Sequence, residues 1–241
     1  MFVVVDGIDG SGKGTIANAL ADRERARGSR VLDVREFAKQ EHRLPEPEET
    51  AAYDLLLSAE PTHTWIGQAI REEIIRDNGR DYTARQTGEA YALDRLMLYT
   101  RVLLPARARG AHIIQERSFT TSIVYQPIQA EAITVAELLA MPGNTFALIN
   151  APDLCIIVST EPARAMQRLA LRSDKRDDAI FERLPFLERS HEGFHASWFR
   201  DLLTAHGCRV EYLDANGAVE DAVARAHTMW DTISVPTHAH A

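Results

Sequence analysis

The sequence predicts an α/β fold in which a mostly parallel β-sheet carries helices on both faces. Short apolar runs, such as residues 2–5 and 154–158, alternate with longer segments of helical periodicity. Strands that alternate with helices form parallel sheets, because each connecting helix packs back onto the sheet. The 241 residues, 45% of them hydrophobic, are enough for one sizeable α/β domain and few for two. We therefore expect one domain over residues 1–234 and a disordered tail over residues 235–241.

The first predicted strand, residues 2–5, leads into a glycine-rich loop that opens directly onto a helical segment. The loop reads Gly-Ile-Asp-Gly-Ser-Gly-Lys-Gly-Thr over residues 7–15. Such a loop turns successive backbone N–H groups toward phosphate oxygens at the positive end of a helix, and its lysine reaches the outer phosphates. The loop therefore predicts binding of a nucleoside triphosphate. The expected phosphate-binding residues are Asp9, Gly10, Ser11, Gly12, Lys13, Gly14 and Thr15.

The loop differs by one position from the strict phosphate-loop pattern, in which Ser or Thr follows the lysine and brings a hydroxyl to Mg²⁺. Here Gly14 follows Lys13, and Thr15 comes one residue later. The loops of adenylate kinases also read Gly-Lys-Gly-Thr, so the sequence resembles a variant known among nucleotide kinases. The loop and the alternating pattern together predict a P-loop NTPase-type sheet similar to that of nucleoside monophosphate kinases.

The helices that follow are predicted from apolar residues at helical spacing and from the turn residues that end them. Ile16 and Leu20 begin this spacing after the loop, and Ile66, Ile70 and Ile74 repeat it at four-residue intervals. The expected helices cover residues 14–28, 66–74, 84–107, 161–171, 184–203 and 219–233.

The strands that follow are predicted from short apolar runs. They cover residues 30–37, 53–57, 112–115, 154–158 and 208–213. The sequence leaves open which of the runs 30–37 and 53–57 joins the sheet, and the extra segment 38–52 has no assigned purpose.

Charged residues follow the buried strand 112–115 directly, with Glu116 and Arg117 first among them. This places them at the carboxyl edge of the sheet, where open α/β sheets bind ligands and where the phosphate loop also lies. A carboxylate at this edge, opposite the Thr15 hydroxyl, is the arrangement that a nucleotide-bound Mg²⁺ needs. We therefore expect Thr15 and Glu116 to hold the metal and Arg117 to contact an acceptor phosphate.

Composition excludes several other classes of function. The net charge is −8, so a general electrostatic contact with nucleic acid is not expected. The two cysteines, Cys155 and Cys208, stand in apolar strand-like runs and predict buried thiols in a reducing compartment. No apolar run is long enough to cross a membrane, and no signal-peptide pattern opens the chain. These observations predict a cytoplasmic enzyme that acts on small molecules.

With these pieces placed, the sequence resembles the thymidylate kinases over about residues 2–215. The pieces that carry the resemblance are the phosphate loop, Tyr91-x-x-Asp94-Arg95, Glu116-Arg117, Ser122-x-x-Tyr125-Gln126 and a charged lid segment with two arginines. The resemblance implies an enzyme that transfers the γ-phosphoryl group of ATP to dTMP, or to a related pyrimidine deoxynucleotide, with Mg²⁺. It also implies a homodimer that associates through long helices.

The resemblance also implies roles for single residues. Tyr91 would stack on the pyrimidine, Arg95 would contact its O4, and Ser122 would face the far side of the base. Tyr125 would lie under the sugar, and Asp9 would lie near the 3′-hydroxyl. The expected acceptor-binding set is Asp9, Glu60, Arg71, Tyr91, Arg95, Arg117, Ser122, Tyr125 and Gln126.

Phosphoryl transfer needs positive charge around the transferred group. Residues 173–178 are dense in charges of both signs and lack apolar anchors, so a mobile lid is expected near residues 172–183. When this lid closes, it would exclude water and bring up arginines. The expected catalytic residues are Lys13, Arg117, Arg172 and Arg176.

One segment departs from the family pattern, which has an arginine just before or after a Glu-Pro or Phe-Pro pair to hold the acceptor phosphate. Here the segment reads Ser-Ala-Glu-Pro-Thr over residues 58–62, without that arginine. Together with Trp65 it resembles deoxynucleoside kinases, in which this glutamate, here Glu60, takes the proton of a nucleoside 5′-hydroxyl. Two alternatives therefore stand beside a thymidylate kinase: a deoxynucleoside kinase, and a nucleotide-binding protein without transfer activity.

Overall fold

The computed structural model describes residues 1–171 and 180–234. The predicted catalytic arginines Arg172 and Arg176, most of the predicted lid and the predicted tail lie outside the described residues. Along the described chain, no helix is long and apolar enough to cross a membrane.

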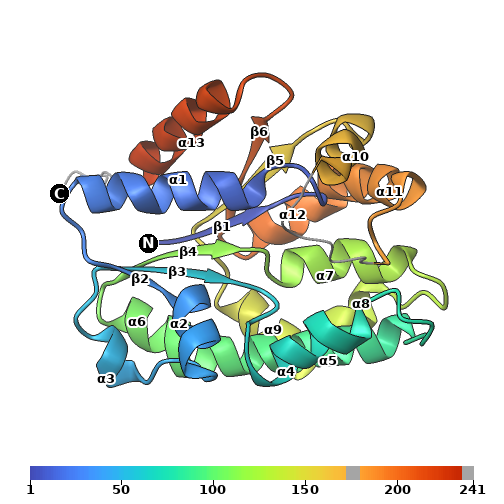
Figure 1. The fold of residues 1–241 in the computed structure, drawn as a ribbon, viewed down its shortest axis with the longest axis horizontal. Coiled ribbons are helices and arrows are strands. Elements are labelled where there is room, and N and C mark those ends of the chain that lie inside the picture. The colour runs from blue at the N-terminus through green and yellow to red at the C-terminus, as the bar shows by residue number, and fades with distance from the viewer. Residues whose placement is uncertain (172–179, 235–241) are drawn as a thin grey trace.

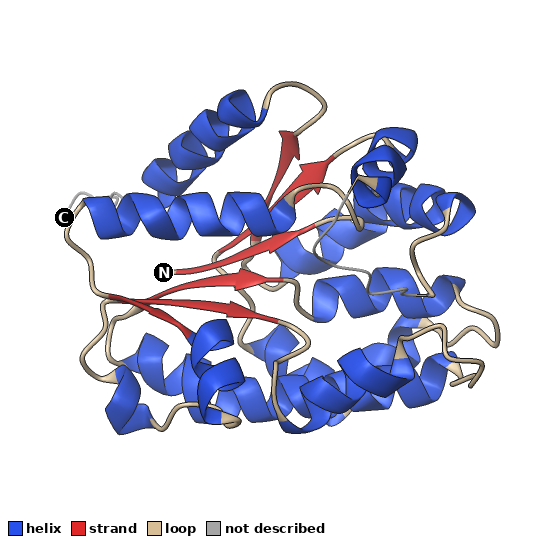
Figure 2. Ribbon diagram, viewed as in Figure 1, coloured by secondary structure: helices blue, strands red, loops and turns tan. Residues whose placement is uncertain are grey.

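The described chain is built around one sheet of six parallel strands, as the sequence predicts (Figure 2). The strands lie in the order β2-β3-β4-β1-β5-β6. Their bounds are β1 Phe2–Asp6, β2 Val31–Asp33, β3 Leu55–Ala59, β4 His112–Glu116, β5 Leu154–Ser159 and β6 Arg209–Asp214. The central strands are buried on both faces, which explains why they read as continuous apolar runs.

Helices cover both faces of the sheet (Figure 1). On one face, α1 (Lys13–Ala26) and α13 (Val219–Ser234) pack together over side chains such as Val5 and Ile114. The other face carries most of the remaining helices over a larger core. Their bounds are α2 Val34–Glu41, α3 Pro47–Thr50, α4 Trp65–Ala69, η1 Ile70–Ile74, α5 Ala84–Leu98, η2 Tyr99–Leu103, α6 Leu104–Ala108, α7 Phe119–Tyr125, η3 Gln126–Ile128, α8 Val135–Leu139, α9 Pro142–Ile149, α10 Pro162–Ala170, α11 Leu184–His195 and α12 Ser197–Ala205.

The predicted strand over residues 30–37 is wrong in its second half. Strand β2 ends at Asp33, and helix α2 begins at Val34. The cause is a helix cap: the Asp33 carboxylate accepts hydrogen bonds from the backbone N–H groups of Arg35 and Glu36. Both apolar runs that the sequence left undecided are sheet strands, since β2 pairs with β3 at the edge of the sheet.

The extra segment 38–52 packs against the long helix of the lower layer in Figure 1. Leu44 is buried, Glu46 forms an ion pair with Arg101, and Thr50 accepts a hydrogen bond from Arg109. That long helix runs through α5, the π-helical turn η2 and α6, as predicted. The helix predicted over residues 184–203 is instead two helices, because the backbone at Ala196 is extended.

Gly143 on α9 allows the close packing of this helix against α5, and its replacement by alanine is expected to destabilise the fold. A Cβ atom at this position would lie 1.7 Å from the carbonyl oxygen of Ala92. Overpacking of this kind costs about 1–3 kcal/mol, so we expect Gly143→Ala to lower the melting temperature by about 2–12 °C. Thermal unfolding followed by circular dichroism measures this. Gly217→Ala is the matched control, because a Cβ there meets nothing within 4 Å; equal melting of both variants would contradict the packing.

Candidate functional site

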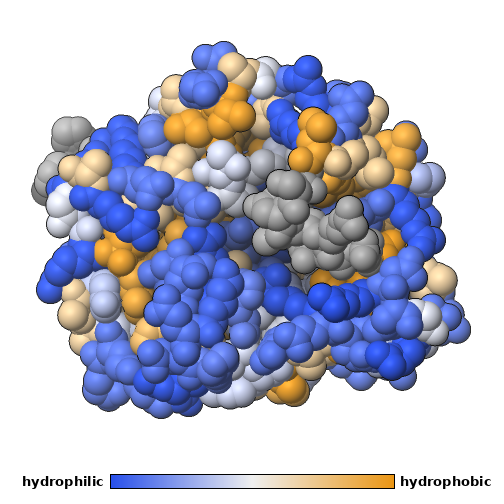
Figure 3. Space-filling view, viewed as in Figure 1, coloured by the Kyte–Doolittle hydropathy of each residue, from blue (hydrophilic) through white to orange (hydrophobic). Residues whose placement is uncertain are grey.

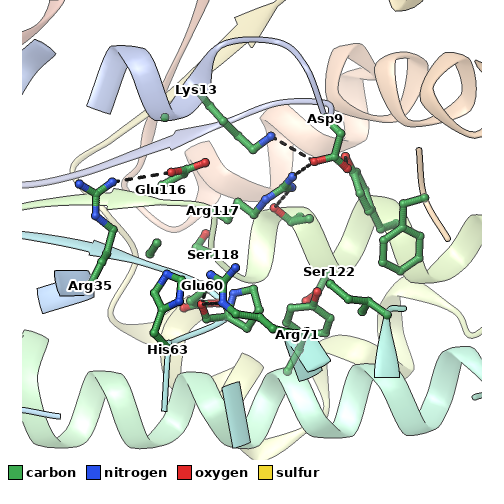
Figure 4. Close-up of a pocket in the computed structure, with 18 of the residues that line it drawn as sticks. Asp9, Lys13, Arg35, Glu60, His63, Arg71, Glu116, Arg117, Ser118 and Ser122 are labelled. Carbon is green, nitrogen blue, oxygen red and sulfur yellow. Dashed lines mark hydrogen bonds and ion pairs between the residues drawn. The ribbon is translucent and has the colours of Figure 1, made fainter. Parts of the chain in front are cut away.

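A cavity of about 490 Å³ lies at the carboxyl edge of the sheet. It is bordered by the loop after β1, the segments after β3 and β4, and residues of α2, α5 and α7. Figure 3 shows a mostly hydrophilic surface on the face of the molecule that Figure 1 views, and Figure 4 shows many of the lining side chains. The position agrees with the ligand-binding edge that the sequence predicts.

The structure brings most of the predicted site residues to this one cavity. The lining includes Asp9, Gly12, Lys13, Gly14, Thr15, Glu60, Arg71, Tyr91, Arg95, Glu116, Arg117, Ser122, Tyr125 and Gln126. Two predicted loop residues, Gly10 and Ser11, belong to the same loop without lining the cavity. Gly10 has φ of 78° and lies against α10, where a Cβ would come within 2.4 Å of the Ala165 carbonyl oxygen.

Lys13 lies at the start of α1 and is folded back over the phosphate loop. Its Nζ donates to the Ile8 carbonyl oxygen at 3.1 Å and lies 3.5 Å from the Asp9 carboxylate. Burial lowers the pKa of Lys13, because desolvation disfavours the charged form and Arg117 repels it. A phosphate placed among the loop amides would offer this ammonium a stronger partner than a neutral carbonyl.

Arg117 forms an ion pair with Asp9 and places a second cation beside Lys13. Its backbone has φ of 64°, the left-handed conformation that non-glycine residues adopt rarely and often at functional sites. Burial raises the pKa of Asp9, but Arg117 and Lys13 outweigh burial and lower it to about 2. Asp9 also accepts a hydrogen bond from the Tyr125 hydroxyl at 3.2 Å. Asp9, Lys13 and Arg117 therefore form one charged cluster between the two ends of the cavity.

Glu116, the last residue of β4, places its carboxylate against Gly14 of the phosphate loop. Its Oε2 would be 3.1 Å from a Cβ built on Gly14, so the loop glycine leaves room for this carboxylate. The Thr15 side chain lines the same cavity. Carboxylate and hydroxyl oxygens suit Mg²⁺, which keeps several waters and needs few protein ligands. The pair therefore fits a magnesium ion, although among the described residues no group of three acidic, histidine or cysteine side chains is gathered.

Glu60 and Arg95 form a fully buried ion pair below the cavity. Arg95 Nη2 lies 2.6 Å from Glu60 Oε2, and Gln115 donates to the other carboxylate oxygen at 2.7 Å. Arg95 also donates to Asn144 and, at 3.2 Å, to Ser122. Burial raises the pKa of Glu60 to about 7, because desolvation outweighs the attraction of Arg95.

Aromatic side chains form the end of the cavity away from Glu116. Tyr125 meets Phe181 and Phe186 edge to face, with ring centres 5.5 Å and 5.1 Å apart. Tyr91 also lines this cavity, and burial raises the pKa of its hydroxyl to about 12. Arg71 donates to the carbonyl oxygens of Pro61 and Thr62, which fixes the loop after β3. This end offers the flat apolar surfaces that a nucleobase needs.

Comparison with known proteins identifies the family. The sequence pattern that describes thymidylate kinases matches residues 39–225, which is most of the chain. The chain belongs to the thymidylate kinase family.

Individual members agree with this assignment. The chain is 32% identical over 199 residues to a thymidylate kinase of a Synechococcus species, covering 80% of this chain and 81% of the relative. It is 27% identical over 227 residues to a thymidylate kinase of an Exiguobacterium species, covering 91% and 89%. A probable thymidylate kinase of Pyrococcus horikoshii is 28% identical over 191 residues, covering 78% and 77%. The resemblance read from the sequence is therefore confirmed.

Several residues in or beside the candidate site are absent from the sequence-based prediction. Asp6 is buried at the end of β1 and accepts hydrogen bonds from the hydroxyl groups of Thr120 and Thr121 at 2.5 Å and 2.8 Å. The sequence could have indicated Asp6, because this residue stands directly before the phosphate loop. Arg168 on α10 donates to the carbonyl oxygens of Ser11 and Ala215 at 3.2 Å and 2.7 Å. The others are Arg35, Asn144 and Phe181, for which the local sequence gives no signal.

Proposed function

We propose that the protein transfers the γ-phosphoryl group of ATP to dTMP, giving dTDP and ADP. The observation that carries this proposal is the joint placement of Lys13, Arg117 and Glu116 around one cavity that ends in an aromatic wall. The phosphate loop supplies a donor site, the aromatic wall supplies an acceptor site, and the charges lie between them. Membership of the thymidylate kinase family supports the choice of ATP and dTMP.

At the donor end, the backbone amides of residues 9–15 and the Lys13 ammonium would hold the triphosphate. Mg²⁺ would be held by Thr15 and Glu116, and it would supply positive charge to the phosphate oxygens. Bound in this way, the triphosphate would place its γ-phosphorus toward Arg117. Arg172 and Arg176 are proposed on sequence alone to add charge there.

At the acceptor end, Tyr91, Tyr125 and Gln126 would surround the nucleoside, and Asp9 would accept a hydrogen bond from the sugar hydroxyl. Arg95 and Ser122 would reach the base edge from the buried network below. Arg71 supports this end through the loop carbonyls that it binds. The acceptor phosphate would then point toward Arg117.

The reaction needs little covalent chemistry from the chain. An oxygen of the acceptor phosphate forms a bond to the γ-phosphorus as the bond from that phosphorus to the bridging oxygen of ATP breaks, and ADP leaves. The acceptor oxygen is already anionic at neutral pH, so no general base is required. Lys13 and Arg117 instead offset the negative charge of the two phosphates that approach each other.

The deoxynucleoside kinase alternative gains one observation, the raised pKa of Glu60, which lies near the working pH of a general base. The contacts of Glu60 oppose this role. One carboxylate oxygen is paired with Arg95 and the other accepts from Gln115, so Glu60 serves as the counter-ion of a buried arginine. We therefore favour the monophosphate as acceptor.

Further parts of the proposal rest on sequence or family. We propose one catalytic domain over residues 1–234 and a homodimer that forms through the long helices, where Leu93 on α5 is 47% exposed. The two cysteines are buried free thiols, which supports a reducing cytoplasm. The net charge of −8 argues against nucleic acid as a partner.

A coupled assay of ADP release with dTMP, dUMP and thymidine tests the proposed function. We expect turnover with dTMP to exceed turnover with thymidine by several orders of magnitude. Faster turnover with thymidine would establish the nucleoside kinase, and ATP binding without turnover on any acceptor would establish a nucleotide-binding protein.

The variant Glu60→Gln separates a counter-ion from a general base. Loss of the buried charge weakens the Arg95 pair at a cost of about 1–3 kcal/mol, so we expect the melting temperature to fall by about 2–12 °C. Turnover with dTMP below the melting range is expected to stay within about tenfold of wild type, since no proton must be removed. Loss of all turnover in folded Glu60→Gln protein would favour the general base. Glu137→Gln, which changes an exposed pair with Arg85, is the control.

A further inference from the structure

The last residue of β3, Ala59, is uncharged, whereas β4 is followed directly by Arg117 at the same edge of the sheet. Ala59 ends β3 and pairs in register with Glu116 on β4, so their side chains lie on the same face of the sheet. Glu60, next to Ala59, is paired with Arg95. Arg71 lies further along the chain and lines the cavity, and its Nε and Nη2 donate to the carbonyl oxygens of Pro61 and Thr62.

Arg35, on helix α2, brings a guanidinium to the cavity beside the end of β3. It lies in the first turn of α2, which the cap at Asp33 starts, and its side chain lines the large cavity. Its Nη1 is 3.9 Å from Glu116 Oε2, and Figure 4 shows Glu116 between Arg35 and Arg117. A second small cavity is bordered by Arg35, Ala59 and His63 together. The guanidinium of Arg35 therefore occupies the space beside the uncharged end of β3.

The guanidinium of Arg35 is held in a fixed orientation. Asp33 accepts from Nε at 2.9 Å and from Nη2 at 2.7 Å, and Asn18 on α1 accepts from Nη2 at 2.7 Å. Among the described residues Nη1 has only the longer contact with Glu116. Since the side chain is 15% exposed and already ordered, binding an anion through Nη1 costs little conformational entropy.

The extra segment 38–52 explains why α2 stays over the cavity. The carbonyl oxygen of His42, at the end of α2, accepts a hydrogen bond from Thr64 at 2.8 Å. Beyond it, Glu46 is paired with Arg101 on the long helix, and Leu44 is buried. The segment thus fastens α2 to the loop after β3 and to the helix below.

We propose that Arg35 binds the phosphate of the acceptor monophosphate and so takes the place of an arginine beside the Glu60–Pro61 pair. This inference rests on the proposed function, because it names the residue that distinguishes a monophosphate from a nucleoside at that site. Arg35 and Arg117 would hold the acceptor phosphate from two sides, in front of Lys13. Segment 38–52 would then hold α2, and with it Arg35, in place beside the cavity.

Calorimetric titration with dTMP and with thymidine tests this role, because the two ligands differ only in the phosphate. The wild type is expected to bind dTMP more tightly than thymidine in buffer with Mg²⁺. In Arg35→Ala, dTMP affinity is expected to fall about 10- to 100-fold, the effect of one charge-assisted hydrogen bond to phosphate. Thymidine affinity is expected to change less than about threefold. Arg85→Ala is the control, because Arg85 is exposed and pairs with Glu137 away from the cavity.

Each other outcome overturns the inference in a recognisable way. Equal loss of dTMP and thymidine affinity in Arg35→Ala would mean that Arg35 only supports the fold of α2, and circular dichroism would show this as a lowered melting temperature. Loss of affinity for a non-hydrolysable ATP analogue, with the preference for dTMP intact, would place Arg35 on the donor phosphates. Failure of the wild type to bind dTMP at all would instead refute the proposed function, independently of Arg35.

Discussion

Replacement of Lys13 by alanine is expected to lower kcat for dTMP phosphorylation by about 10³-fold, the loss typical of a preorganised charge that acts on the transition state. Lys13 is buried at the start of α1, and among residues 1–171 and 180–234 its ammonium has only a carbonyl oxygen and Asp9 as partners. The triphosphate would therefore become its main counter-charge, and no other described side chain of the phosphate loop carries positive charge. Steady-state kinetics with saturating ATP and dTMP measure the loss.

The fold should survive this change. Removal of a buried cation whose pKa burial already lowers leaves Asp9 paired with Arg117, so the melting temperature is expected to change little. Arg25→Ala, on an exposed turn of the same helix, is the control and should keep full activity. Retention of most activity by folded Lys13→Ala protein would refute the assignment of residues 7–15 as the donor site.

Replacement of Arg117 by alanine is expected to lower kcat/KM for dTMP by about 10³-fold, in the range seen when an arginine on a transferring phosphate is removed. Two effects combine. The acceptor phosphate loses a guanidinium, and Asp9 loses the partner that contributes most to holding its pKa near 2. We expect both a higher KM for dTMP and a lower kcat, because the contact is made before and during transfer.

The variant Arg117→Lys separates charge from geometry. Lysine keeps the charge but cannot form a two-pronged contact, so an intermediate loss is expected. Arg200→Ala, an exposed arginine on α12, is the control for a general change of charge. Wild-type kinetics for both Arg117 variants would show that Arg117 only neutralises Asp9.

The sequence was sufficient to predict that the phosphate loop and the Glu116–Arg117 pair lie at one edge of the sheet. The phosphate loop and the Glu116–Arg117 pair both follow buried strands directly, and in a parallel sheet the ends of such strands meet at one edge. Buried strands are readable because their apolar runs have no alternation, as in β1 and β5. Residues that directly follow a buried strand can therefore be placed from the sequence without knowledge of tertiary contacts.

The parts that the sequence did not predict have two causes, a local helix cap and contacts between distant segments. Residues 30–37 contain Val31, Val34 and Phe37, which favour a strand, and one hydrogen-bonding cap at Asp33 decides for a helix instead. Because helix α2 begins at Val34, the side chain of Arg35 lines the cavity. The pairing of Glu60 with Arg95 joins a strand end to a helix 35 positions later, and only packing brings the two together.

The buried network of Arg95 has a consequence for attempts to change which nucleobase the protein accepts. Arg95 on α5 contacts Ser122 on α7, Asn144 on α9 and Glu60 after β3, so four segments share one guanidinium. A designer who alters Arg95 alone would remove the attraction that lowers the pKa of Glu60 and would leave a buried, protonated carboxyl group without its partner. Laboratory evolution toward a new base should therefore proceed through paired or grouped replacements at these positions.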